Sequence, residues 1–149
     1  MRLVLDQPAA VAAWVAAHIP QMGGAADFGP STAIGVVSAD GRALGGVVFH
    51  NYQPRFRNIE VSFASESRRW LTRNLIRQIL AYPFDQLGCQ RLTAITPKNA
   101  RAARAFLDHF GFKREGVVRR GFGTDDAIIS GLMRREWMQS RWVARPPRA

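Results

Sequence analysis

The chain has little of several residue types, and each shortage excludes a class of protein. Cys89 is the only cysteine in 149 residues, which excludes an intramolecular disulfide and a cluster of thiolate metal ligands. No apolar run is long enough to cross a bilayer. Residues 9–17 are apolar, but Asp6 and Pro8 precede them and only Arg2 is basic, so the segment does not fit a signal peptide. We expect a protein of a reducing compartment, the cytoplasm.

Lysine is also scarce, because only Lys98 and Lys113 are present. Arginine therefore supplies nearly all of the 21 basic residues, which face 11 acidic residues and give a formal net charge of +10. Guanidinium groups suit phosphates and carboxylates. Three alternatives stay open: a solvated basic surface, a phosphate-bearing cofactor, or weak contact with a nucleic acid.

The first half of the chain is patterned as strands with one helix. The hydrophobic content of 47% is enough for one domain with a core of its own. Pro8 suits a first helical turn, and Pro20 ends that helix. His18 falls on the apolar face, where we expect it to be buried or half-buried. Apolar alternation, with Asp40-Gly41 as a hairpin turn, predicts strands over residues 2–5, 32–39, 43–52 and 56–65.

The second half reads as strand, helix and hairpin. A helix is predicted over 69–82 and a strand over 91–96, which makes a parallel pair with a right-handed crossover. Asn99 can cap the next helix, and Gly111 can end it with φ > 0. A final hairpin follows over 112–120 and 127–135. We expect one domain over residues 1–137 and a basic tail over 138–149.

This second half carries the motifs of a known family. The chain reads Asn99-Ala100-Arg101-Ala102, then Gly111-Phe112, then Glu115-Gly116. In this order and spacing the motifs resemble the C-terminal half of the GCN5-related N-acetyltransferases, the GNAT superfamily. The likeness covers about residues 31–137. Three further segments resemble its prophage-associated and ribosomal-protein-acetylase-like branch: Trp70-Leu71-Thr72-Arg73, residues 82–88, and Arg134-Arg135-Glu136-Trp137.

The resemblance implies a fold class and an activity. The fold would be α/β (α+β): a GNAT-like mixed sheet, with an antiparallel meander, a parallel strand–helix–strand pair and a C-terminal hairpin. The activity would be transfer of the acetyl group of acetyl-CoA to an amine acceptor, which could be a small molecule, a peptide or a protein N-terminus. The protein would be a monomer or a homodimer with no membrane partner.

The resemblance also implies where acetyl-CoA would bind. The family holds the pyrophosphate at a strand-to-helix turn, where free backbone N–H groups attract anions. Arg68 matches the first motif position, but Leu71 and Arg73 stand where glycines are usual. Arginine side chains would then replace close backbone contacts. The predicted cofactor residues are Phe63, Ala64, Ser65, Arg68, Arg69, Trp70, Leu71, Thr72, Arg73, Asn99 and Ala102.

The pattern offers two candidate bases and no residue at the usual position of the acid. Many relatives carry a tyrosine acid seven residues after the motif asparagine, but here that position is Phe106, which has no proton to give. Glu60 and His50 are the candidate general bases, and Glu60 could instead be an exposed cross-strand partner. His109 is expected to serve in packing. No metal site is predicted.

A second class of function stays open at this point. The missing glycines and tyrosine also fit a GNAT-like binding protein that uses its basic surface for a nucleic acid or a protein partner. Aromatic residues interleaved with arginine near the C-terminus, such as Trp137 and Trp142, favour such contact slightly.

Overall fold

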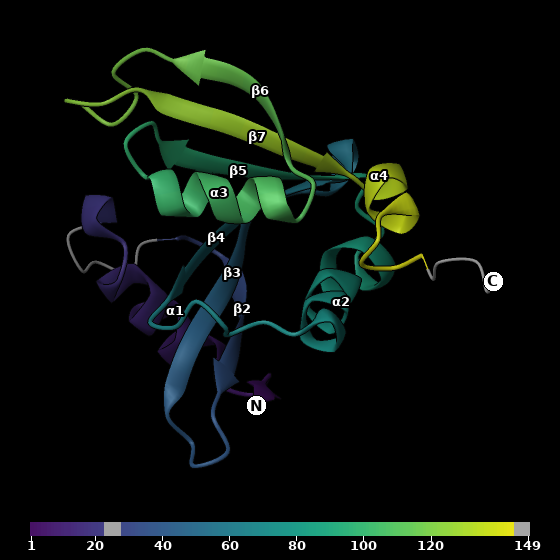
Figure 1. Cartoon of the computed structure of the whole chain (residues 1–149). Coiled ribbons are helices and arrows are strands. Elements are labelled where there is room, and N and C mark those ends of the chain that lie inside the picture. The colour runs from purple at the N-terminus through teal and green to yellow at the C-terminus, as the bar shows by residue number, and fades with distance from the viewer. Residues whose placement is uncertain (23–27, 145–149) are drawn as a thin grey trace.

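A seven-stranded mixed sheet forms the centre of the protein. The computed structural model describes residues 1–22 and 28–144 (Figure 1); part of the predicted loop over 21–30 lies outside this range. The strand order is β1-β2-β3-β4-β5-β7-β6. The strands are β1 Arg2–Val4, β2 Ser31–Val37, β3 Ala43–Gln53, β4 Asn58–Ser65, β5 Arg91–Pro97, β6 Lys113–Val118 and β7 Ala127–Met133. The helices are α1 Pro8–Ala17, α2 Arg73–Ala81, α3 Arg101–His109 and α4 Arg134–Gln139.

The pairing confirms the predicted topology. Strands β1 to β4 form antiparallel neighbours in chain order. Strand β5 then lies parallel to β4, with α2 in the crossover between them. Strand β7 enters between β5 and β6 and is antiparallel to both. The sheet is therefore the predicted meander, parallel pair and C-terminal hairpin.

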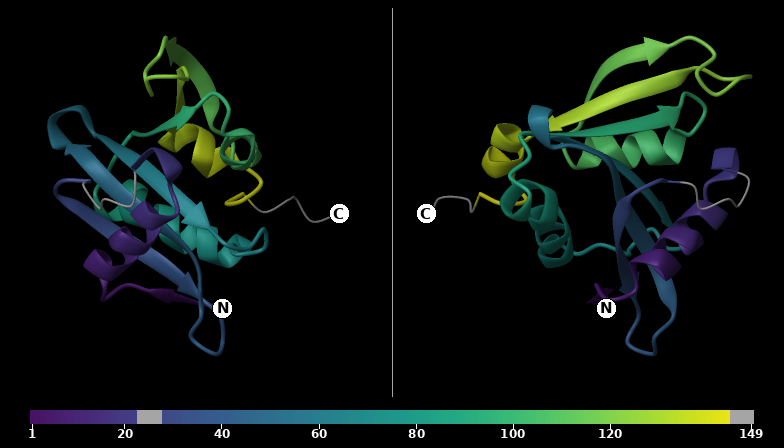
Figure 2. Two further views of the ribbon diagram at one scale, coloured as in Figure 1. Left: turned by 90° about the vertical axis from the view of Figure 1, so that its left-hand side faces the viewer. Right: turned by 180° about the vertical axis from the view of Figure 1, so that it is seen from behind.

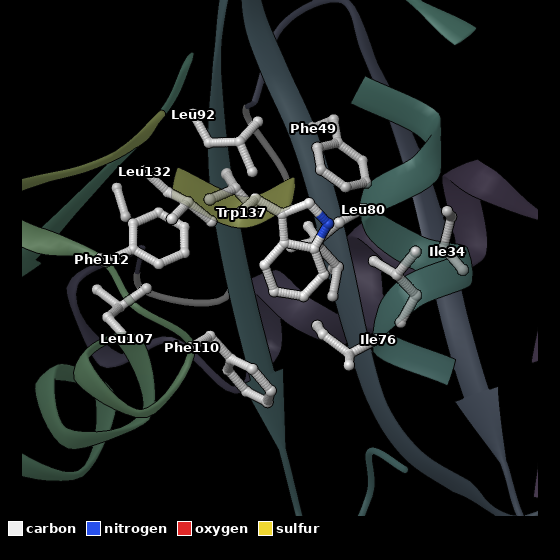
Figure 3. Close-up of a cluster of buried hydrophobic side chains, with 14 of the residues drawn as sticks. Ile34, Phe49, Ile76, Leu80, Leu92, Leu107, Phe110, Phe112, Leu132 and Trp137 are labelled. Atoms are coloured by element: carbon white, nitrogen blue, oxygen red, sulfur yellow. The ribbon is translucent and has the colours of Figure 1, made fainter. Parts of the chain in front are cut away.

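The helices cover the sheet unequally (Figure 2). Helix α1 lies on the opposite face from α2 and α3. It packs Ala12 and Val15 against Val48 in a small cluster. The larger core lies under α2 and α3, where Phe49, Leu92, Leu107 and Trp137 meet (Figure 3). Burial of these large apolar side chains is the main term that holds the two halves of the sheet together.

Both helix starts in the second half differ from the sequence prediction. Helix α2 begins at Arg73 instead of residue 69, because the Thr72 hydroxyl accepts the backbone N–H of Leu75 at 3.1 Å and caps it there. Helix α3 has Ala100 as its N-cap with no side-chain cap bond. Asn99 instead donates its backbone N–H to Asp125 of the β6–β7 loop at 2.8 Å. The predicted Asn99 cap is therefore wrong.

The C-terminal segment packs on the domain through residue 144. Helix α4 extends to Gln139 and buries Trp137. Trp142 then lies against Phe110, with ring centroids 4.8 Å apart. Residues 138–144, which we expected to be part of a basic tail, thus lie beside α2 and α3. No helix in the described ranges is long and apolar enough to span a membrane.

Gly111 ends α3 as the sequence indicated, with φ +96°. We predict that Gly111→Ala lowers the free energy of unfolding by about 1 kcal/mol or more, because an L-residue is strained at this φ. Gly116→Ala is the control, since Gly116 has ordinary φ and open space where the new methyl group would stand. Urea unfolding of both variants tests this; equal stability of the Gly111 variant and the parent would contradict it.

Candidate active site

A split in the sheet creates the main cleft of the protein. Strands β4 and β5 pair only from Asn58↔Arg91 to Glu60↔Thr93. Beyond Glu60, β4 stays paired with β3 as far as Ser65, and β5 stays paired with β7 as far as Pro97. The two strands therefore diverge with their outer partners, and a cleft of about 750 Å³ opens between them.

The lining of the cleft combines strand backbone, small side chains and a few polar groups. Residues 61–65 of β4 form one wall and residues 95–97 of β5 another. Backbone groups of 61–65 that point away from β3 have no partner strand in the described part of the chain. Alanines of α3, such as Ala102 and Ala105, leave room above the opening. The end of α1 closes the remaining side.

The structure brings six of the predicted cofactor residues to this cleft and leaves five away from its lining. The six are Phe63, Ala64, Ser65, Arg68, Trp70 and Ala102. The described lining does not include the other five, namely Arg69, Leu71, Thr72, Arg73 and Asn99. Thr72 is the cap of α2, and Leu71 packs against the larger core.

Arg73 is bonded elsewhere, against expectation. Its Nε donates to the backbone oxygen of Trp142 at 3.2 Å, and its second terminal nitrogen donates to that of Ala144 at 3.1 Å. The guanidinium therefore holds the C-terminal segment against the start of α2. Arg68, which is exposed at the edge of the cleft, has no such commitment among the described contacts.

An aromatic stack forms the inner wall of the cleft. Phe106 lies between Phe63 and Trp70, with centroid distances of 4.5 and 5.6 Å. Trp70 is only 2% exposed. It lines the cleft and also belongs to the larger hydrophobic core. Its ring lies over Gly45, where a Cβ would overlap it. Trp70 thereby anchors the segment between β4 and α2 on the larger core.

The two candidate bases lie side by side. His50 and Glu60 are direct partners in the β3–β4 register, and His50 Nε2 lies 3.6 Å from Glu60 Oε2. Burial lowers the pKa of His50, while the nearby Glu60 carboxylate opposes that shift. Only 20% of the Glu60 side chain is exposed. Neither residue is in the described lining of the cleft.

His18 is a cleft residue that the sequence reading missed. It is exposed at the end of α1, not buried on the helix stripe. Its Nδ1 lies 2.7 Å from the Trp14 oxygen and its Nε2 lies 2.8 Å from Glu66 Oε1. Both bonds raise the pKa of His18, and the bond to the Trp14 backbone oxygen contributes more than the bond to Glu66. Glu66 is 48 residues away, so no local pattern could have indicated the pair.

His109 lines the opposite side of the cleft at the end of α3. Its ring makes edge contacts with Phe110 and Trp142 at 5.1 and 5.0 Å. The expected packing role is partly right, because the contacts exist, but the side chain is exposed to the cleft.

Comparison with solved structures identifies the fold. A mutant form of the spermidine/spermine N-acetyltransferase SpeG from Vibrio cholerae superposes with TM-score 0.64 at 17% identity, over 72% of this chain and 69% of that one. The chain has the GNAT fold. The ribosomal-protein-S5-alanine acetyltransferase from Vibrio fischeri superposes with TM-score 0.62 at 17% identity, over 72% of this chain and 63% of that one.

A dodecameric spermidine N-acetyltransferase from Vibrio cholerae is a third GNAT neighbour, with TM-score 0.66 at 17% identity. That alignment covers 74% of this chain and 69% of the other. No family model and no curated protein matches the sequence. The shared GNAT fold thus rests on structure, and these neighbours are acetyltransferases by name.

We predict that Glu66→Gln lowers the pKa of His18. The pKa should stay above the ordinary histidine value, because the bond to the Trp14 oxygen is kept. A raised pKa in the folded state means that the pair stabilises the protein below the unfolded-state pKa and that this stabilisation is lost as pH rises through the folded-state pKa. The stability difference between parent and variant should therefore shrink as the pH rises through the folded-state pKa of His18. NMR titration of His18 and urea unfolding from about pH 5 to pH 9 test this; a difference independent of pH would contradict it.

Proposed function

We propose that this protein is an N-acetyltransferase that passes the acetyl group of acetyl-CoA directly to an amine in a ternary complex. The observation that carries the proposal is the divergence of β4 from β5 after Glu60↔Thr93. It leaves strand backbone facing a cleft, so that an extended amide-bearing chain such as pantetheine could add to β4 like a short strand.

The mouth of the cleft suits the phosphates of the same molecule. Arg68 is exposed there, and its side chain has no partner among the described contacts, so its guanidinium can bind a pyrophosphate. The departure from the glycine-rich motif changes which groups serve. Arg73 holds the C-terminal segment, so Arg68 is the side chain that we assign to the pyrophosphate.

The main task of the enzyme would be to align the amine with the thioester. Holding amine and thioester together removes most of the entropic cost of their encounter. A backbone N–H of 61–65 can stabilise the negative charge that develops on the carbonyl oxygen. Phe106 stacks in the wall and offers no proton, so the leaving thiolate takes its proton from solvent.

The acceptor would enter from the side of α1. His18, Ile19 and Gln21 line the cleft there, next to the loop of which residues 23–27 lie outside the described ranges. The neighbours are named for spermidine and for a ribosomal protein alanine. For this chain we propose an amine as the class of acceptor, and a monomer or homodimer as its state.

The binding-protein alternative loses the slight support that the C-terminal aromatic residues gave it. Trp137 is 3% exposed, and Trp142 packs on Phe110. These rings are therefore not free to stack on bases. The net charge of +10 remains available for weak, salt-sensitive contact with a nucleic acid.

We predict that CoA raises the melting temperature of the protein, since a ligand of the folded state stabilises it by mass action. Arg68→Ala should weaken CoA binding about 10-fold or more, because it removes a charge-assisted bond worth roughly 1.5–3 kcal/mol. Arg69→Ala is the matched control, as its side chain is exposed and is not in the described lining. Calorimetric titration measures all three proteins.

Two outcomes would count against the proposal in different ways. If the parent chain does not bind CoA, the acetyltransferase assignment is wrong. Binding that is equally tight in parent and Arg68→Ala would leave the activity possible but remove Arg68 from the phosphate site.

A further inference from the structure

A serine, a histidine and a glutamate meet behind the β4 wall of the cleft. Ser62 Oγ lies 2.8 Å from His50 Nε2, and the same nitrogen lies 3.6 Å from Glu60 Oε2. Ser62 is in the described lining of the cleft, whereas His50 and Glu60 are not. Of these three residues, Ser62 is therefore the one through which a molecule in the cleft could reach the imidazole.

The sheet register holds this group together. His50 pairs directly with Glu60, and Ser62 follows two residues later on the same face of β4. Ser31 is the partner of His50 on β2, and the Phe28 ring lies 5.1 Å from the imidazole. Among these neighbours, Glu60 is the charged group. Only 11% of the His50 side chain is exposed, so its contacts are fixed by packing.

The protonation of His50 decides what the group can do. Burial lowers its pKa, which favours a neutral ring at neutral pH. With the ring proton on Nδ1, Nε2 accepts the Ser62 hydroxyl, and the lone pairs of Ser62 stay free for an N–H in the cleft. When Nε2 gains a proton, the Glu60 carboxylate stabilises the resulting charge.

Building on the proposed acetyl transfer, we propose that Ser62 Oγ takes the proton of the attacking amine and passes its own proton to His50 Nε2. Ser62 is then the catalytic residue that touches the acceptor. His50 is the base that acts through it, and Glu60 is a positioning residue.

The step balances in atoms and charge. The amine nitrogen forms a bond to the acetyl carbon, and the carbon–sulfur bond of the thioester breaks. The nitrogen loses one proton to Ser62 as the serine proton moves to His50. The products are an amide, a CoA thiolate and an imidazolium. The thiolate then gains a proton from solvent, and the imidazolium returns one to solvent.

The kinetic test uses acetyl-CoA and a short peptide with a free α-amine as the probe, with thiol release as the signal. Ser62→Ala should lower kcat about 100-fold or more and leave the affinity for CoA unchanged. His50→Gln should cost a similar factor, and the double variant should be no worse than either single one. Ser31→Ala is the control, because it makes a similar change beside His50 but away from the cleft.

The pH profile separates the role of Glu60 from a structural one. Activity should rise with pH as His50 loses its proton. Glu60→Gln removes the charge that favours the imidazolium, so this rise should move to lower pH. A profile that keeps its midpoint in the Glu60 variant would overturn the positioning role.

A second readout needs no acceptor. Nitrogen NMR of His50 at about pH 8, where the ring is neutral, should show the proton on Nδ1 and none on Nε2. A proton on Nε2, full activity of Ser62→Ala, or an acetyl group found on Ser62 by mass spectrometry would each overturn the relay. Failure of CoA to bind would instead overturn the proposed function, so the two failures are distinguishable.

Discussion

The parallel pairing of β4 with β5 is short, and the rest of the structure is arranged around this fact. Three residue pairs hold the two halves of the sheet together. Each strand keeps its antiparallel partner on the far side, so the twist of each half carries the strand ends apart. The core under α2 and α3 fills the closed end of the opening with large apolar side chains. The open end becomes a cleft because no side chain of comparable size in the described ranges fills it.

The sequence indicated this architecture well, because it rests on local patterns. Alternation placed the three meander strands, and Gly111 marked the end of α3 with its positive φ. The order of strand, crossover helix and strand predicted the parallel pair. The structural neighbours confirm the GNAT fold that the resemblance implied.

The errors fall where a distant residue decides the local structure. Asn99 looked like a cap, but the Asp125 carboxylate from the β6–β7 loop binds its backbone N–H. Arg73 looked like a phosphate ligand, but it bonds to carbonyls about 70 residues later in the chain. The Trp70 ring packs over Gly45 of β3, a contact that the local pattern around residue 70 does not show. No window of sequence contains both members of any of these contacts.

The Arg73 bonds to Trp142 and Ala144 also couple the position of the C-terminal segment to the spacing of α2 and α3. The C-terminal segment contacts the end of α3 through the Trp142 ring nitrogen, which donates to the His109 oxygen at 3.3 Å. One short piece of chain therefore bonds both to the start of α2 and to the end of α3. The two contacts are thermodynamically coupled. A ligand that favours separation of α2 from α3 weakens the binding of this segment, and a ligand that favours the bound segment opposes the separation by the same free energy. The spacing of α2 and α3 is then set partly by a segment of backbone that lies outside the described lining of the cleft.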